Sequence, residues 1–137
     1  MPSPNGILES ALYVEDVKRS IQFYTSILNL ETLMADDRFC ALSVAGHQVL
    51  LLFKKGSATE PTVTSGGTIP SHDGSGNLHV AFSISAADLG HWEERLQEKA
   101  VPIESKVKWP RGGHSLYIRD PDSHLVELIT PGCWPIY

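Results

Sequence analysis

The chain presents the same order of secondary-structure patterns twice, and this repetition limits its possible folds more than any other feature. Residues 7–14 alternate between apolar and polar side chains, as a half-buried strand does, and residues 77–84 match that alternation. In each half, the first strand pattern is followed by one helical pattern and three further strand patterns. The sequence therefore predicts two β-α-β-β-β modules.

The first module carries the clearest signals for where elements begin and end. Apolar side chains form one helical stripe over residues 17–28, with Asp16 placed to cap its N-terminus and Asn29 to end it in a left-handed conformation. Residues 45–47 have the composition of a tight hairpin turn. Strands are expected at residues 30–34, 39–44 and 48–53.

The second module repeats this plan. A helix is expected over residues 89–100, with Asp88 as its N-cap. Its three remaining strands are expected at residues 102–108, 114–119 and 125–130.

Between the modules the composition shifts to Gly, Ser, Thr and Pro, and no regular structure is expected there. A loop of this length often covers a binding site, although a passive connector is equally compatible with the sequence. We expect a single domain. It would comprise module one at about 7–54, a linker at 55–76, module two at about 77–131 and a tail at 132–137.

Length, charge and cysteine content exclude several classes of protein. A chain of 137 residues suits one domain, and its net charge of −5 argues against binding to nucleic acid. No segment approaches the ~18 consecutive apolar residues of a membrane span, and the first residues do not resemble a signal peptide. Cys40 and Cys133 lie far apart without metal-binding spacing, so we expect reduced thiols in a cytoplasmic protein.

Three side chains with metal-binding chemistry interrupt apolar strand patterns. Glu9 and His79 fall on matched positions, and Glu127 lies in the apolar last strand, where a carboxylate is costly unless paired or coordinated. Separately, each has an ordinary interpretation: solvent exposure for Glu9, a hydrogen-bonded core imidazole for His79 and a water-facing edge-strand carboxylate for Glu127. Together they form a ligand set for Mn²⁺, Fe²⁺, Ni²⁺ or Zn²⁺ that leaves coordination positions open.

Several motifs resemble those of the vicinal oxygen chelate superfamily, which includes glyoxalase I, bleomycin resistance proteins, extradiol dioxygenases and fosfomycin thiol transferases. Residues 8–24, with their V-x-D and S-x-x-F-Y spacing, are similar to its opening signature. Residues 78–84 resemble the strand that bears a ligand histidine, and residues 115–128 resemble the final hairpin with its ligand glutamate. The resemblance covers about residues 7–131. It implies an α+β fold whose modules form a curved mixed sheet around a metal-binding cleft.

By this resemblance, Glu9, His79 and Glu127 take the metal positions. Many members have His where this chain has Glu9, and Leu51 stands where glyoxalase I has a fourth ligand. The resemblance implies a divalent-metal-dependent enzyme whose small-molecule substrate chelates the metal through neighbouring oxygens, with lyase, isomerase, dioxygenase or thiol transferase chemistry. The alternative is a non-catalytic small-molecule or drug-binding protein of the bleomycin resistance type; a structural interaction module is a third possibility. A homodimer is implied, with or without exchange of strands between copies.

Five side chains are expected to line the substrate cleft: Phe39, Phe53, Trp109, Tyr117 and Arg119. Tyr117 could bind a substrate oxygen or be a packed aromatic residue. Arg119 could capture a carboxylate or phosphate, or form a surface ion pair. In the repeat, the strand carrying Phe39, Ala41 and Ser43 is matched with Gly113, Ser115 and Tyr117.

The other histidines are weaker candidates for the functional site. His114 adjoins the expected cleft and is a candidate acid or base. His47 and His124 lie at hairpins and are expected to be exposed, and neither His72 nor His91 is expected to bind metal.

Overall fold

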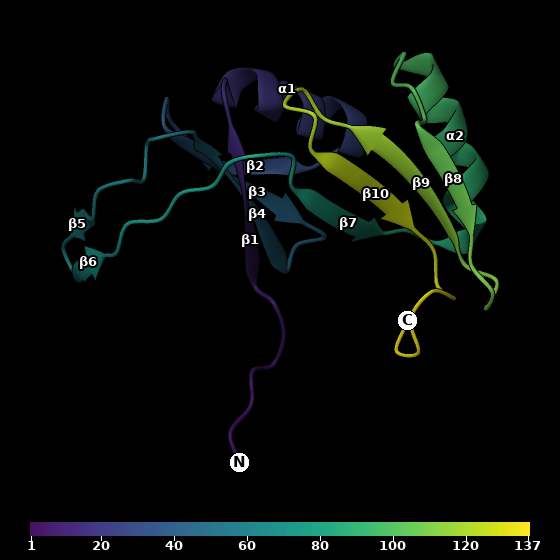
Figure 1. The fold of residues 1–137 in the computed structure, drawn as a ribbon, viewed down its shortest axis with the longest axis horizontal. Helices are drawn as coiled ribbons and strands as arrows, with labels where there is room; N and C mark the ends of the chain where they lie inside the picture. Colours follow the sequence, from purple (N-terminus) through teal and green to yellow (C-terminus); the bar gives the residue numbers. More distant parts are fainter. The chain divides into compact units, whose positions relative to one another are not determined.

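The computed structural model describes residues 1–137, which divide into two compact units, residues 1–76 and residues 77–137. The first unit contains, in order, β1 (Glu9–Val14), α1 (Val17–Leu28), β2 (Glu31–Ala35), β3 (Phe39–Val44), β4 (Gln48–Lys54), β5 (Thr62–Thr64) and β6 (Gly67–Ile69). The second contains β7 (His79–Ser83), the 3-10 helix η1 (Ala86–Asp88), α2 (Leu89–Glu98), β8 (Ser105–Lys108), β9 (His114–Arg119) and β10 (Leu125–Ile129) (Figure 1).

Each unit is built on one four-stranded mixed sheet. The strand orders are β1-β4-β3-β2 and β7-β10-β9-β8. In both sheets the first strand pairs in parallel with the last, and the remaining pairs are antiparallel. The repeated β-α-β-β-β order and the α+β class predicted from the sequence are therefore confirmed.

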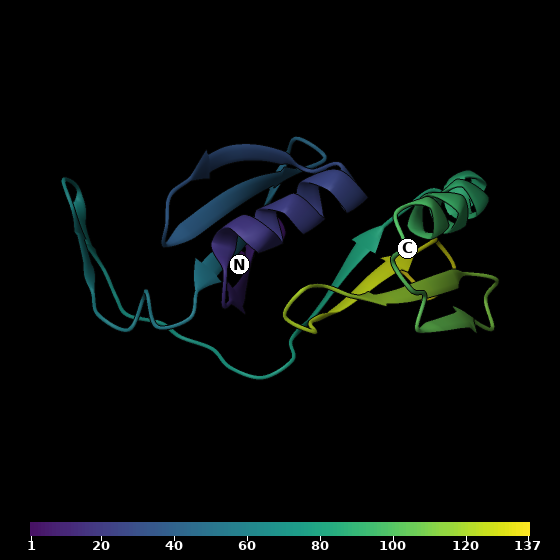
Figure 2. The ribbon, with the colours of Figure 1, turned by 90° about the horizontal axis from the view of Figure 1, so that it is seen from above.

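Local sequence signals explain α1. The Asp16 carboxylate accepts a hydrogen bond from the Arg19 backbone N–H over 3.2 Å, and Asn29 ends the helix at φ 57°. Val17 and Tyr24 on its apolar stripe are buried, and α1 contacts β3 and β4 (Figure 2). Both predicted helix ends are confirmed.

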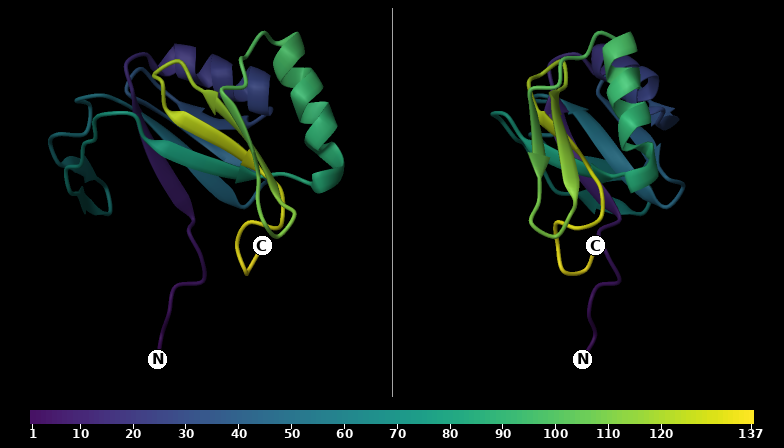
Figure 3. Two further views of the ribbon diagram at one scale, coloured as in Figure 1. Left: turned by 45° about the vertical axis from the view of Figure 1, so that its right-hand side comes forward. Right: turned by 90° about the vertical axis from the view of Figure 1, so that its right-hand side faces the viewer.

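The helix of the second unit begins differently from the prediction. Asp88 has φ −94° and ψ 0° and makes no capping hydrogen bond with its side chain. The chain is already helical in η1, whose own cap is Ser85, where the hydroxyl oxygen accepts from the Ala87 N–H over 3.3 Å. The prediction of Asp88 as N-cap was thus wrong. Helix α2 buries Leu96 and lies along one side of the sheet of its unit (Figure 3).

The segment between the expected modules is more ordered than its composition indicates. Strands β5 and β6 form a short antiparallel hairpin, in which Thr62 pairs with Ile69 and Thr64 with Gly67. Three-residue strands are too short to produce a readable alternation, so the sequence did not reveal them.

The registers of the two sheets refine the repeat. Leu51 lies opposite Ala41 in the first unit, and Glu127 lies opposite Tyr117 in the second. Ala41 therefore corresponds to Tyr117, and the predicted match of Ala41 with Ser115 was wrong by two residues. A shift of two leaves the side chains on the same face of the sheet, so the face assignment is unaffected.

No helix of the structure has the length and apolar character that membrane crossing requires.

Candidate metal centre and substrate cavity

His79 and Glu127 lie together on one face of the second sheet. Strand β10 lies between β7 and β9, with Leu125 opposite His79 and Glu127 opposite Ala81. His79 Nε2 is 3.5 Å from Glu127 Oε1. Glu127 is only 6 % exposed, whereas the His79 side chain is half exposed. The interpretation of Glu127 as a water-facing edge-strand carboxylate is therefore wrong, since it is buried on a central strand.

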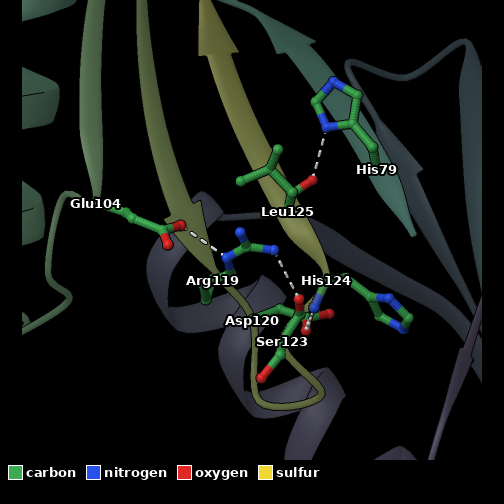
Figure 4. Close-up of polar contacts among 7 residues, drawn as sticks. All are labelled: His79, Glu104, Arg119, Asp120, Ser123, His124 and Leu125. Atoms are coloured by element: carbon green, nitrogen blue, oxygen red, sulfur yellow. Dashed lines mark hydrogen bonds and ion pairs between the residues drawn. The ribbon is translucent and has the colours of Figure 1, made fainter. Parts of the chain in front are cut away.

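The hydrogen-bond partner of His79 Nδ1 shows which ring nitrogen carries the proton. His79 Nδ1 lies 2.9 Å from the Leu125 carbonyl oxygen (Figure 4). A carbonyl oxygen only accepts, so Nδ1 carries the hydrogen and donates it. In the neutral imidazole, Nε2 is then a bare acceptor facing a carboxylate oxygen. Two acceptors at this separation call for a cation between them, which is either a proton or a metal ion.

A hydrogen-bonded relay holds the second oxygen of Glu127. The Ser115 hydroxyl donates to Glu127 Oε2 over 2.9 Å, and the Trp109 indole N–H donates to the Ser115 oxygen over 2.8 Å. Ser115 is fully buried. The relay leaves Oε1 directed at His79. Sequence reasoning missed Ser115, and found Trp109 only as a cleft residue, because nothing in their spacing signals the contact.

Tyr117 lies directly opposite Glu127 across the β9–β10 pair, and its ring centroid is 6.5 Å from that of His79. Burial raises the pKa of the Tyr117 hydroxyl, and a hydrogen bond with Glu127 and its negative charge raise it further, while a hydrogen bond with Ser115 lowers it. The phenol therefore stays protonated at neutral pH and can act as a hydrogen-bond donor.

The chemistry of these groups fits a divalent cation. Ligand atoms ~2.0–2.2 Å from a tetrahedral metal ion lie roughly 3.4 Å apart, close to the separation of the facing His79 and Glu127 atoms. Metal-bound histidines almost always donate their other N–H to a carbonyl or carboxylate, as His79 does here. The structure contains no cluster of three or more His, Cys, Asp or Glu side chains suited to a metal.

Glu9 belongs to the first unit and is exposed at the start of β1. It pairs with Val49 of β4, as His79 pairs with Leu125 of β10. The two residues thus occupy equivalent places in their respective sheets. Leu51 occupies the place in the first unit that Glu127 has in the second, as the sequence predicts.

Glu9 also lines a cavity of about 670 Å³ within the first unit. Phe39 and Phe53, both predicted to line the cleft, form its floor together with Tyr13. These rings make a row across three strands, with centroids 6.0 Å apart for Tyr13 and Phe53 and 5.6 Å apart for Phe53 and Phe39. Tyr13 was not singled out from the sequence, although its alternation with Glu9 on the same face of β1 was readable.

Arg119 is already engaged by protein groups. Its Nε donates to Glu104 over 2.7 Å, and its Nη1 donates to the Ser123 carbonyl over 3.1 Å (Figure 4). It shares the face of β9 that carries Tyr117. The structure therefore gives Arg119 the surface ion pair that was weighed against a role in substrate binding.

Two other histidines depart from expectation. His124 is fully buried, not exposed, and its Nδ1 accepts a hydrogen bond from the Leu78 backbone N–H over 2.9 Å. His114 lies on the face of β9 opposite to that of Ser115, so its side chain points away from the face that carries Glu127. His47 is exposed, as expected.

Comparisons with known proteins identify a matching family model and several similar proteins. Residues 6–128 match the family model described as the Glyoxalase/Bleomycin resistance protein/Dioxygenase superfamily. The metallothiol transferase FosB of Staphylococcus epidermidis is 30 % identical over 118 residues, which are 85 % of this chain and 75 % of the relative. The catechol-2,3-dioxygenase of Bacillus subtilis is 27 % identical over 122 residues, covering 85 % of this chain and 38 % of the relative. The crystal structure of lactoylglutathione lyase from Agrobacterium tumefaciens superposes with a TM-score of 0.88 at 29 % identity, covering 98 % of this chain and 99 % of that one.

Proposed function

The chain belongs to the Glyoxalase/Bleomycin resistance protein/Dioxygenase superfamily, and from this premise we propose that it is a divalent-metal-dependent enzyme acting on a small molecule whose neighbouring oxygens chelate the metal. The observation that carries the proposal is the 3.5 Å approach of His79 Nε2 to an oxygen of the buried Glu127 carboxylate. The relatives include a thiol transferase, a dioxygenase and a lyase, and the reaction is proposed to belong to these types or to be an isomerisation.

The proposed ligands are Glu9, His79 and Glu127. The equivalent registers of Glu9 and His79 in their sheets support this set. One imidazole with two carboxylates suits Fe²⁺, Mn²⁺, Ni²⁺ or Zn²⁺. When bound, such an ion would polarise substrate oxygens and lower the pKa of a neighbouring proton donor.

Groups of the chain itself orient the proposed metal ligands and the substrate. Ser115 and Trp109 are positioning residues that fix the Glu127 carboxylate through hydrogen bonds. Tyr117, protonated at neutral pH, is placed on the same face to donate a hydrogen bond to a substrate oxygen. Leu125 fixes the His79 tautomer through its carbonyl.

Thermal denaturation tests the proposal. A ligand that binds only the folded state raises the unfolding midpoint, by about 2.7 kcal/mol of stability at a concentration 100 times its Kd. We expect at least one of Mn²⁺, Fe²⁺, Ni²⁺ and Zn²⁺ to raise the midpoint of the wild-type protein but not that of Glu127→Gln. Glu104→Gln, which alters a carboxylate on the protein surface, serves as the matched control. Equal shifts in all three proteins would contradict the proposal.

A second candidate function is favoured by one observation. The first unit has a largely apolar cavity that is complete without a metal ion. A non-catalytic small-molecule or drug-binding protein would require such a cavity. Binding of a small apolar ligand without any metal response would favour this alternative.

The proposal also includes a homodimer in the cytoplasm, with both units forming one domain. The family match spans both units, which supports a single domain. Ile7 and Leu8, beside Glu9, are 76 % and 66 % exposed, and a second copy would cover them. The unpaired thiols of Cys40 and Cys133 suit a reducing compartment.

Mixed dimers test how copies share sites. If strands are exchanged, Glu9 of one copy meets Glu127 of the other. Mixing Glu9→Gln with Glu127→Gln then restores one intact site per dimer, and metal binding recovers in part. If strands are not exchanged, every site in the mixture carries one substitution and no binding recovers. A protein that sediments as a monomer at all concentrations would remove the dimer from the proposal.

A further inference from the structure

The start of strand β7, which carries His79, is bound by a side chain as well as by the sheet. In the parallel pair of β7 and β10, the Leu125 N–H donates to the Leu78 carbonyl over 2.8 Å. The Leu78 N–H, one residue before the strand, donates to His124 Nδ1 over 2.9 Å. The fully buried imidazole of His124 therefore extends the hydrogen bonds between the two strands beyond their first pair of residues, His79 and Leu125.

The His124 ring replaces a backbone acceptor at this place. A continued parallel ladder would direct the Leu78 N–H at the carbonyl of Ser123. Ser123 instead lies in a turn with φ 65°, and its carbonyl accepts from Arg119 Nη1 over 3.1 Å (Figure 4). The partly buried Leu78 N–H would be destabilising without an acceptor, and the imidazole supplies one.

The turn before β10 fixes the main chain of His124. The buried Asp120 carboxylate accepts from the His124 backbone N–H over 2.9 Å (Figure 4). It also accepts from the Asp122 N–H over 2.9 Å. The Asp120 N–H donates in turn to the His124 carbonyl over 3.1 Å. Because its own main chain is bound to the turn in this way, His124 can hold the Leu78 N–H at a defined place.

The first unit offers a comparison within the same chain. Its strands make the equivalent backbone contact, since the Val49 N–H donates to the Leu8 carbonyl over 2.9 Å. Gln48 stands in the place of His124, however, and it is exposed. The β-α-β-β-β arrangement therefore forms without a buried imidazole at this position. The imidazole accompanies the unit in which a histidine faces a buried carboxylate.

The contact at Leu78 bears directly on the neighbouring His79. His79 is the first residue of β7, the outermost strand of its sheet, and its side chain is half exposed, so packing alone does not fix the ring. Strand ends are also the places that open most readily. The hydrogen bond from His79 Nδ1 to the Leu125 carbonyl orients the ring. That bond requires the main chain at residues 78 and 79 to stay beside Leu125.

We propose that His124 is a positioning residue, which fixes the start of β7 through the Leu78 N–H and thereby keeps His79 Nε2 directed at Glu127. The consequence for metal affinity rests on the proposed function. The positioning itself concerns the orientation of the His79 ring in the metal-free protein and can be measured there. Groups that orient metal ligands contribute about 10–100-fold to metal affinity.

Two substitutions of similar size separate the acceptor from the packing. In His124→Asn, the amide oxygen is as many bonds from the main chain as Nδ1 is in the imidazole, and it can accept from Leu78. His124→Leu places a methyl group there, which cannot accept. His91→Leu alters a histidine whose side chain is 79 % exposed and serves as the control. Circular dichroism and urea denaturation verify that each variant is folded under the conditions used.

The tautomer of His79 in the metal-free full-length protein is the first measurement. With EDTA present and the ring neutral, ¹⁵N NMR distinguishes a hydrogen on Nδ1 from one on Nε2, and His79→Gln assigns the signals. We expect wild type, His124→Asn and His91→Leu to keep the Nδ1–H form. We expect His124→Leu to lose it in favour of the Nε2–H form, which a free side chain prefers in water. A change in stability alone would not move this signal.

Metal affinity is the second measurement. In isothermal titration with Zn²⁺ or Mn²⁺, His124→Leu is expected to bind about 10-fold or more weakly than wild type, and His124→Asn to recover to within about threefold of wild type. Hydrogen exchange of the wild-type Leu78 amide needs no variant. We expect this amide to exchange about 10-fold or more slowly than an unprotected one, because it is bound to His124.

The outcomes separate this inference from the proposed function. An unchanged His79 tautomer in His124→Leu or an unprotected Leu78 amide would overturn the inference. Equal affinities of His124→Leu and His124→Asn for a metal that wild type binds would also overturn it. A tautomer that depends on His124, together with a wild type that binds no metal, would sustain the positioning and overturn the proposed enzyme.

Discussion

Ser115 donates its hydroxyl hydrogen to Oε2 of Glu127 over 2.9 Å, and both side chains are buried. The two oxygens of the carboxylate therefore have different partners. Oε2 is fixed from within the sheet, and Oε1 faces His79. The Glu127 carboxylate is thus held by Ser115 on one side and faces His79 Nε2 on the other, which is the arrangement that the proposed metal site requires.

Ser115→Ala is expected to lower metal affinity about 10-fold or more, since outer hydrogen bonds to metal ligands typically contribute 10–100-fold. Isothermal titration with Zn²⁺ or Mn²⁺ measures the change. Ser105→Ala, at an exposed serine of the same sheet, is the matched control and should bind as wild type does. If Ser115→Thr, which keeps the hydroxyl, binds no better than Ser115→Ala, the hydrogen bond is not the cause.

Trp109→Phe keeps an aromatic ring but removes the N–H that donates to Ser115. We expect a smaller loss of metal affinity, about 2- to 10-fold, because one neutral hydrogen bond contributes about 0.5–1.5 kcal/mol. Trp134→Phe alters an indole that is 65 % exposed and should have no effect. Equal affinities for Trp109→Phe and wild type would show that the relay ends at Ser115.

Glu127→Gln should lower the pKa of Tyr117 toward its ordinary value. Burial remains the largest cause of the raised pKa, but the negative charge of Glu127 is removed. NMR titration of ¹³C-labelled tyrosine, assigned with Tyr117→Phe, follows the change between pH 8 and 12. Glu104→Gln is the control. A Tyr117 pKa unchanged by Glu127→Gln would mean that the two groups do not interact.

The buried thiol of Cys40 makes stability depend on alkaline pH. Burial raises its pKa from 9.0 to about 11. Between those values the unfolded chain releases a proton that the folded chain retains, so stability falls as pH rises through this window, by about 2.7 kcal/mol at most. Urea denaturation should show that this alkaline loss is smaller in Cys40→Ala than in wild type. Parallel pH profiles for the two proteins would contradict the assignment.

The sequence predicted what depends on periodicity and local capping. Asp16 and Asn29 bound a helix because their hydrogen bonds and backbone angles involve only near neighbours. Glu127 was identified because a carboxylate within an apolar strand needs a partner, and its burial beside His79 agrees with that reasoning.

Contacts between distant segments could not be predicted in the same way. The buried His124 ring accepts its hydrogen bond from the Leu78 N–H, 46 residues away in sequence. The contact of Tyr13 with His72 spans 59 residues. The match of Ala41 with Tyr117 required strand registers, which hydrophobic alternation leaves uncertain by two residues.

The most direct test of the central claim is the metal content of the purified full-length protein. Wild type, Glu127→Gln and Glu104→Gln are dialysed in parallel against a slight excess of Mn²⁺, Fe²⁺, Ni²⁺ or Zn²⁺ and then against buffer, and metal per chain is measured by elemental analysis. The account predicts close to one ion per chain in wild type and Glu104→Gln for at least one metal, and a loss of that ion in Glu127→Gln. Equal metal content in all three proteins, or none in wild type with any metal, would contradict it.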